Sequence, residues 1–368
     1  MKHLPHSKKA MIEVQFNWIF VLIVGAILVA FFVTLGVKQK YISEEKTSYT
    51  SLSSFDSLLT SAGISANTLI VIDTPNVLFE YDCNTFRIGS VSKAVNEKPI
   101  FAPKKLKSTK LITWTQDFFL PYKVTNLLYM SNPKKEYVFV GKSTDVVLNN
   151  LQNNLPKNFS AIRFDETVWQ SSSGGGSSSF TIGSSTQIQQ YSSDTQFRFI
   201  FSGISSNMIT LPESFASKQD GDVTGVSIAA DKLYFYEKKG VNLKKIVPTS
   251  SSQSYSGEPS FNDPAIEYAA LFSDDLENYQ CAMGKVARKY SIITRVYDVT
   301  FTNVLLSPDL DDVCKPFYDA GITALSMSNV PLTNDAYSTF AASTVMSSAA
   351  TLKQLNKAMK TESCPLLY

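Results

Sequence analysis

The chain has 368 residues, with 34 lysines and arginines against 32 aspartates and glutamates and a formal net charge of +2. Its hydrophobic content of 44% is that of a globular protein, which excludes a largely disordered chain. Three lysines and one glutamate among the first 15 residues account for the whole net charge, so the rest of the chain is neutral. A nucleic-acid partner is not expected, because binding phosphates requires an excess of basic residues.

An uncharged apolar run extends from Phe16 to Val37. At about 1.5 Å per helical residue it reaches about 33 Å, which matches a hydrocarbon core of about 30 Å. We therefore predict one transmembrane helix over residues 16–37, with the lipid bilayer as its partner. The membrane-anchoring residues predicted within it are Phe16, Trp18, Phe20, Gly25, Phe31 and Phe32.

The charges on either side of this run predict its orientation. Lys2, Lys8 and Lys9 precede it within residues 1–15, whereas the lysines after it are offset by Glu44 and Glu45. Because positive charge stays on the cytoplasmic side, we predict a cytoplasmic N-terminus and a main domain outside the cell membrane. Apolar residues then recur at three- and four-residue steps, which predicts a stalk helix over residues 38–63.

The order of residues just before the apolar run, Lys9 and Ala10 followed by Met11, resembles the class III signal of archaeal type IV pilin-like proteins. The resemblance covers residues 1–37. It implies cleavage after Ala10, with Met11 as the new N-terminus and the hydrophobic helix retained for possible self-assembly. The sequence departs from bacterial pilins, since Gln15 stands where their glutamate would be the fifth mature residue. An uncleaved signal anchor remains the alternative.

The part beyond the stalk predicts a mixed α/β domain carried on the single N-terminal helix. Its first part covers residues 64–169, its second part covers 195–368, and a Ser/Gly-rich flexible loop over 170–194 separates them. The clearest unit is a βαβ pattern over residues 137–164. Further strands are predicted at 68–72, 77–81, 86–88, 110–119, 123–130, 196–202, 223–228, 232–237, 266–271 and 292–301, with helices from Ser273 or Asp274 and over 308–317 and 335–360.

All four cysteines lie in the predicted outer domain: Cys83, Cys281, Cys314 and Cys364. An even count in an oxidising compartment predicts two disulfides, with three pairings open. One pairing would join the two helices that carry Cys281 and Cys314, and Cys83 would then join the start of the domain to its end at Cys364.

The strongest chemical restriction comes from histidine. Both histidines, His3 and His6, precede the apolar run, so the outer domain has no histidine for a catalytic triad, a zinc ligand or a general base. Gly141 to Thr144 resembles the end of a phosphate-binding loop but lacks its first glycine, and we interpret it as a turn with Ser143 or Thr144 as a helix N-cap. No cofactor or metal is predicted.

Three functions remain open. The first is an anchored surface protein with a binding or assembly role, either pilin-like or not, that contacts copies of itself or other surface proteins. The second is an anchored hydrolase of envelope polymers that uses a carboxylate pair drawn from Asp73, Glu80, Asp117 and Asp165. The third is a structural subunit of a larger membrane complex, which predicts an exposed apolar patch.

Overall fold

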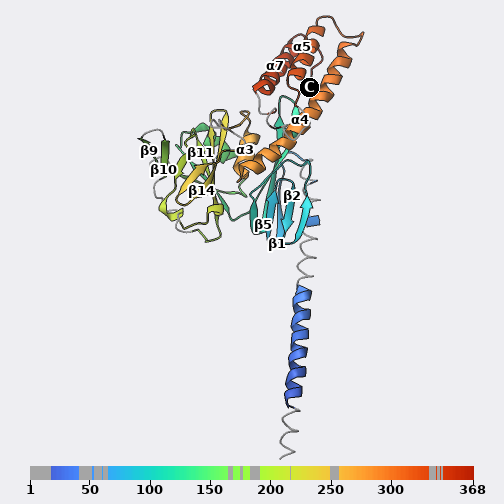
Figure 1. Ribbon diagram of the computed structural model, residues 1–368. Helices are drawn as coiled ribbons and strands as arrows, with labels where there is room; N and C mark the ends of the chain where they lie inside the picture. Colours follow the sequence, from blue (N-terminus) through green and yellow to red (C-terminus); the bar gives the residue numbers. More distant parts are fainter. Residues whose placement is uncertain are drawn as a thin grey trace, which may run out of the picture.

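The structure is a computed structural model that describes residues 18–40, 52–53, 60, 65–164, 169–174, 177–182, 191–215, 217–248, 257–330, 337, 340 and 343–368. These residues form a mixed α/β protein with two sheets, helices packed on them, and one N-terminal helix that extends away from both sheets (Figure 1). The predicted fold class is confirmed at that level.

The N-terminal helix covers Trp18–Lys40 and has a mean hydropathy of 2.9 over its most apolar window. It is long and apolar enough to cross a membrane, and none of that window is buried against the rest of the chain. Among the predicted anchoring residues, the aromatic side chains Trp18, Phe20, Phe31 and Phe32 are exposed, and a Cβ on Gly25 would meet no atom within 4 Å. Phe16, Lys9, Ala10 and Met11 lie outside the described residues, as does most of the predicted stalk.

The first sheet has six strands in the order β3-β2-β1-β5-β6-β4. Their bounds are β1 Leu69–Asp82, β2 Thr85–Ile88, β3 Val91–Ala94, β4 Ile100–Phe101, β5 Lys105–Phe119 and β6 Lys123–Ser131. The predicted strands 68–72 and 77–81 are one strand, because the register shift between Asp73 and Val77 absorbs Pro75 as a bulge and does not end β1.

The second sheet runs in the order β8-β7-β11-β13-β14-β15-β12-β10-β9, with β16 paired to β14. Its bounds are β7 Lys135–Val140, β8 Ser160–Phe164, β9 Trp169–Gly174, β10 Ser177–Ile182, β11 Gln196–Ser202, β12 Met208–Thr210, β13 Val223–Ala229, β14 Lys232–Lys239, β15 Asn242–Lys245 and β16 Glu258–Pro259. The βαβ prediction is confirmed, since β7 and β8 are parallel and are joined by α2 Val146–Asn154. Asp145 is the N-cap of that helix, so the prediction of Ser143 or Thr144 is wrong.

The Ser/Gly-rich stretch predicted as a flexible loop over 170–194 contains most of β9 and all of β10. These two strands pair with each other, and β10 extends the sheet by pairing with β12. Hydrogen bonds between the backbones of neighbouring strands hold this segment in the sheet. Its small polar side chains do not by themselves predict a strand, but serine and threonine are compatible with one when neighbouring strands are present.

In the described residues, the second sheet is followed by α3 Pro264–Phe272, α4 Leu276–Leu305, α5 Lys315–Met327 and α7 Ser343–Thr361. Two predicted strands are wrong here, since residues 266–271 belong to α3 and residues 292–301 continue α4. Asp263 caps α3, where its side chain accepts a hydrogen bond from the Ala265 amide at 2.8 Å. The α3 segment is buried on nearly every side, so its uninterrupted apolar run resembles that of a buried strand.

The core between the sheets is built of aromatic rings. Trp114 of β5 lies edge-on to Tyr268 of α3 at 4.8 Å between ring centroids, and Tyr129 of β6 stacks on Phe272 at 5.2 Å. Tyr137 of β7 contacts the same Phe272, so α3 is buried between strands of both sheets. Trp114 is thus a core residue, only 5% exposed. This shared core joins the two sheets into one folded unit.

Two disulfides form, but the pairing proposed from the sequence is wrong. Cys83 in the β1–β2 turn bonds to Cys281 of α4, with 6.1 Å between the Cα atoms, and Cys314 at the start of α5 bonds to Cys364 after α7, with 5.7 Å. The first fixes α4 to the first sheet. The second closes an arm formed by the outer half of α4, by α5 and by α7, which rises from the sheets at the end opposite the N-terminal helix (Figure 1).

We expect the Cys314→Ser/Cys364→Ser variant to lose about 2 to 4 kcal/mol of unfolding free energy, because the bond closes a loop between positions 50 residues apart in the sequence. Chemical denaturation followed by tryptophan and tyrosine fluorescence would measure the loss. The matched control is Ser326→Ala/Thr323→Ala, on the exposed side of α5, which should stay within about 0.5 kcal/mol. Equal stability of the two double variants would contradict a stabilising role for the bond.

Candidate functional site

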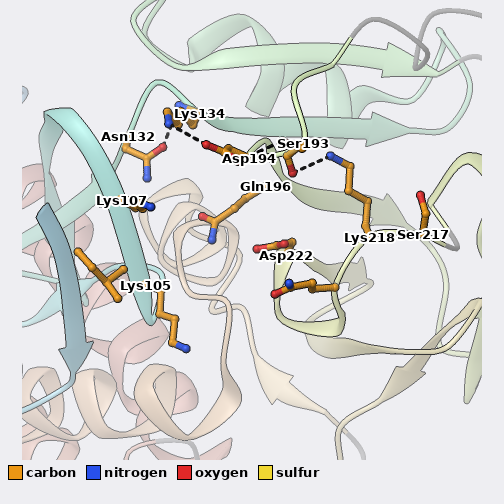
Figure 2. Close-up of a pocket in the computed structure, with 12 residues that line it drawn as sticks. Lys105, Lys107, Asn132, Lys134, Ser193, Asp194, Gln196, Ser217, Lys218 and Asp222 are labelled. Carbon is orange, nitrogen blue, oxygen red and sulfur yellow. Dashed lines mark hydrogen bonds and ion pairs between the residues drawn. The ribbon is translucent and has the colours of Figure 1, made fainter. Parts of the chain in front are cut away.

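The best-formed groove in the described part of the chain lies between the two sheets and encloses about 510 Å³. One wall is β5 of the first sheet, and the other consists of the residues before β11 and before β13 of the second sheet. The turn that joins β6 to β7 closes one end. Figure 2 shows Lys105 and Lys107 on one wall and Lys218 and Asp222 on the other.

The β5 wall follows from the two-residue period of a strand. Leu106 and Ser108 point into the core and are buried, so Lys105 and Lys107 between and beside them point into the groove. Lys105 makes no ion pair with any residue that the structure describes. The wall therefore presents ammonium groups that remain available to a ligand.

Hydrogen bonds to backbone carbonyls and one ion pair hold the opposite wall in place. Lys218 donates from Nζ to the carbonyl oxygens of Ser192 and Ser193, at 2.9 and 3.1 Å. Lys134 donates to a carboxylate oxygen of Asp194 at 3.4 Å, and this bond, with the Ser193 hydroxyl, lowers the pKa of Asp194. No serine hydroxyl of the groove accepts from a lysine amine in the described residues.

A second hollow of about 320 Å³ continues the groove toward the start of α4. Four residues line both hollows: Lys105, Gln196, Gln219 and Asp222. The buried Oε1 atom of Gln196 has no hydrogen-bond partner in the described residues. The joined groove thus offers ammonium groups, carboxylates and amides along one surface, which suits a polar ligand bound by charge and hydrogen bonds.

Beneath this groove lies a buried ionic cluster. Lys135, the first residue of β7, places Nζ 2.5 Å from both carboxylate oxygens of Asp274, and the Oδ1 atom of that carboxylate also accepts from the Thr224 hydroxyl at 3.0 Å. Arg198 of β11 is fully buried, and its Nη2 donates to the carbonyls of Ala270 and Ser273 at the end of α3. The cation thus satisfies helix C-terminal carbonyls that have no partner within the helix.

Burial and neighbouring charge act in opposite directions on these groups. Burial lowers the pKa of Lys135, and the Asp274 carboxylate partly offsets the effect. Burial likewise lowers the pKa of Arg198 to about 10, again opposed by Asp274. The Nε and Nη1 atoms of Arg198 have no hydrogen-bond partner in the described residues, although its guanidinium lies 5.6 Å from the centre of the Phe235 ring. One carboxylate therefore compensates two buried cations.

The predicted carboxylates are not brought together. Asp73 pairs in register with Lys110 and Glu80 with Lys105, which are five residues apart along β5, so the two carboxylates lie about 17 Å apart along the sheet. Asp117 lies further along β5 and forms an ion pair with Lys123 at 2.5 Å. Asp165 lies outside the described residues. The three described candidates give no catalytic pair.

The helix predicted to begin at Ser273 or Asp274 has Asp275 as its N-cap. Asp275 accepts from the Asn278 amide at 3.2 Å, whereas Asp274 accepts from Lys135 in the buried cluster. Lys135 and Arg198 were not among the residues predicted from the sequence. The signal for them was a charged residue within an apolar strand, in KEYVFV and QFRFIFS, because such a residue is buried only with a partner.

A separate cavity of about 710 Å³ lies between the β5–β6 turn and α7. Its polar groups include Asp263 and three lysines of α7, Lys353, Lys357 and Lys360. Next to Asp263, burial and then the charge of Asp263 raise the pKa of Glu267 to about 7. Asp263 caps a helix and Glu267 lies in its first turn, so this pair already has a structural role.

No family model, curated protein or solved structure matches the chain. No group of three or more histidine, cysteine, aspartate or glutamate side chains placed to hold a metal ion occurs among the described residues.

We expect the Asp274→Asn variant to lose about 3 kcal/mol of unfolding free energy, because it removes the main counter-charge of the buried Lys135 and Arg198. Urea denaturation at pH 7 measures the loss. The Asp309→Asn variant, at an exposed position, serves as the control and should unfold like the parent protein. The double variant Lys135→Met/Asp274→Asn should recover part of the loss, and a single variant as stable as the control would show that the ion pair is dispensable.

We expect the Glu267→Gln variant to flatten the dependence of stability on pH. The raised pKa keeps Glu267 protonated in the folded state up to about pH 7, whereas in the unfolded chain the carboxyl has its ordinary pKa of 4.5, so the parent protein loses stability as pH rises between these values. Because the side chain is partly exposed, the change should be about 1 to 2 kcal/mol. Denaturation at pH 5 and pH 8 measures it, with Glu277→Gln as control, and an unchanged slope would contradict the assignment.

Proposed function

We propose that this protein is a single-pass, membrane-anchored surface protein whose α/β domain lies outside the cytoplasm and acts in binding or assembly. The observation that carries the proposal is the combination, in one chain, of an exposed apolar helix of 23 residues at the N-terminus and a domain with both cysteine pairs oxidised. An exposed apolar helix needs a lipid environment, and disulfides persist in oxidising compartments.

Two features favour binding or assembly over hydrolysis. The described carboxylates proposed for catalysis are separated along the strands, and the groove between the sheets carries lysines, amides and carboxylates without a paired nucleophile and base. An exposed apolar face on the arm, described below, supports assembly. We further propose that the chain is cleaved after Ala10, as in archaeal pilin-like proteins. The resemblance of residues 1–37 to their class III signal supports this.

The orientation is tested by fusing either alkaline phosphatase or a green fluorescent protein after Tyr368 in a bacterial host. We expect an active phosphatase and a non-fluorescent fusion in the membrane fraction, because the C-terminal domain would be exported. A variant with Ile27→Lys and Leu28→Lys in the middle of the helix should leave the membrane fraction, since each lysine costs about 2.5 to 3.5 kcal/mol at that depth.

A fluorescent C-terminal fusion with an inactive phosphatase would contradict the proposal. Mass spectrometry of the membrane-extracted protein separates its two forms. A chain that begins at Met11 supports pilin-like processing, whereas a chain that begins at Met1 supports the uncleaved anchor.

A further inference from the structure

The outer half of α4 has two apolar faces, and only one of them is covered. The inner face carries Tyr290, Thr294, Tyr297 and Phe301. Phe301 packs edge-on against Tyr318 of α5, with 6.1 Å between ring centroids, and Tyr297 packs against the C-terminal Tyr368 at 6.4 Å. This face is part of the core of the arm.

The other face lies about 200° around the helix and carries Ile292, Val296, Val299, Asn303 and Leu306. Its four apolar side chains are 53%, 60%, 59% and 76% exposed in that order. A helix that is apolar on opposite faces is normally buried on both. The exposed set therefore forms an unoccupied contact surface, which we call the α4 seam.

The spacing of the α4 seam indicates what covers it. The five positions are separated by steps of four, three, four and three residues, which is the a/d pattern of a coiled coil. Val296 and Asn303 then occupy a positions, and Ile292, Val299 and the C-cap Leu306 occupy d positions. The β-branched Val296 at a, Leu306 at d and Asn303 at a are features that favour parallel dimers and fix their register, whereas Ile292 and Val299 place β-branched residues at the other two d positions.

We propose that the α4 seam pairs with the α4 seam of a second copy of this protein, with the two helices parallel. The inference rests on the proposed membrane anchoring. Copies held in one membrane by their N-terminal helices share one orientation, so a symmetry axis along the membrane normal makes their α4 helices run the same way. The arm lies at the end of the molecule away from the N-terminal helix, where it can meet a neighbouring arm (Figure 1).

The charges beside the α4 seam allow this pairing. Between Ile292 and Leu306 the only charged residues are Arg295 and Asp298, one of each sign, so two identical faces can approach without a run of like charges. In a parallel dimer each Asn303 faces its equivalent, and two side-chain amides can hydrogen-bond to each other because each has both a donor and an acceptor.

The area indicates where pairing occurs. The α4 seam spans 15 residues, from Ile292 to Leu306, and forms a strip about 21 Å long and about 10 Å wide. The area of this strip is well below the roughly 800 Å² per partner of a standard interface. The pairing should be weak between free domains in solution. Two copies confined to one membrane have a raised effective concentration, which compensates for the small area.

Disulfide cross-linking of the full-length protein in phospholipid vesicles tests the inference. The four native cysteines are bonded to each other, so one added cysteine is the only free thiol. We expect the Ile292→Cys and Asn303→Cys variants each to cross-link with itself at least tenfold more than the control Thr323→Cys on the exposed side of α5. Parallel a–a and d–d contacts bring equivalent residues together, whereas an antiparallel pair holds the two copies of residue 303 about 16 Å apart.

A second variant tests the contact itself. Adding Val299→Glu to the Asn303→Cys variant should reduce cross-linking at least fivefold, because it places two like charges in the seam, whereas adding Thr323→Glu should not. Unchanged disulfides and an unchanged unfolding curve confirm that each variant is folded.

The outcomes separate the inference from the proposed function. Cross-linking only between mixed Ile292→Cys and Asn303→Cys chains shows an antiparallel pair and overturns the proposal. Cross-linking that persists with Val299→Glu shows contact elsewhere and also overturns it. Protein that floats with the vesicles but does not cross-link overturns self-pairing and leaves the anchored function standing. Protein that does not float with the vesicles overturns both.

Discussion

The Asp274 carboxylate stands between the last carbonyls of α3 and the N-cap of α4, within 2.5 Å of the Lys135 amine and near the Arg198 guanidinium. Lys135 begins β7 and Arg198 lies on β11, so two neighbouring strands of the second sheet and the junction of two helices are held at one point. Because a buried cation without a counter-charge is strongly unfavourable, the folded chain has to keep this carboxylate within reach of both cations.

From this junction α4 extends for 30 residues and serves two regions of the molecule. Its first turns pack in the common core and are fixed to the first sheet by the Cys83–Cys281 bond. Asn278 accepts from the Cys83 amide at 3.2 Å and Lys285 donates to the Cys83 carbonyl at 2.6 Å, so the same turn is also held by hydrogen bonds. The outer half can then extend beyond the sheets as a stable arm, because its base is fixed and α5 and α7 cover its inner face.

Much of the first half of the fold could be predicted because local pattern and tertiary environment agree there. The β7–α2–β8 unit combines an apolar strand, an amphipathic helix and a second strand, each with its own period. The local pattern and the tertiary environment disagree in residues 266–271 of α3 and 292–301 of α4, which were predicted as strands. Residues 292–301 are rich in β-branched side chains, which favour a strand locally, but the helix continues because its inner face packs against α5.

The candidate site was harder to predict for a related reason. The groove is formed by residues from β5, from the segment before β11 and from the loop before β13, and no local pattern indicates that these meet. Disulfide pairing has the same limitation, since Cys83 and Cys281 are 198 residues apart in sequence. The sequence does show two charged residues in apolar strands, Lys135 and Arg198. Such residues require a buried counter-charge, but nothing in their pattern identifies Asp274 as that counter-charge.

The groove and the α4 seam share one helix. Asp274 and Asp275 line the inner end of the groove, and Asp275 is the N-cap of α4, whose far half carries Ile292 and Val299. A ligand with acidic groups bound to Lys105 would therefore lie against the start of the helix that presents the contact surface. The groove and the α4 seam thus occupy opposite ends of one helix about 45 Å long, whose base is fixed by the junction at Asp274 and by the Cys83–Cys281 bond.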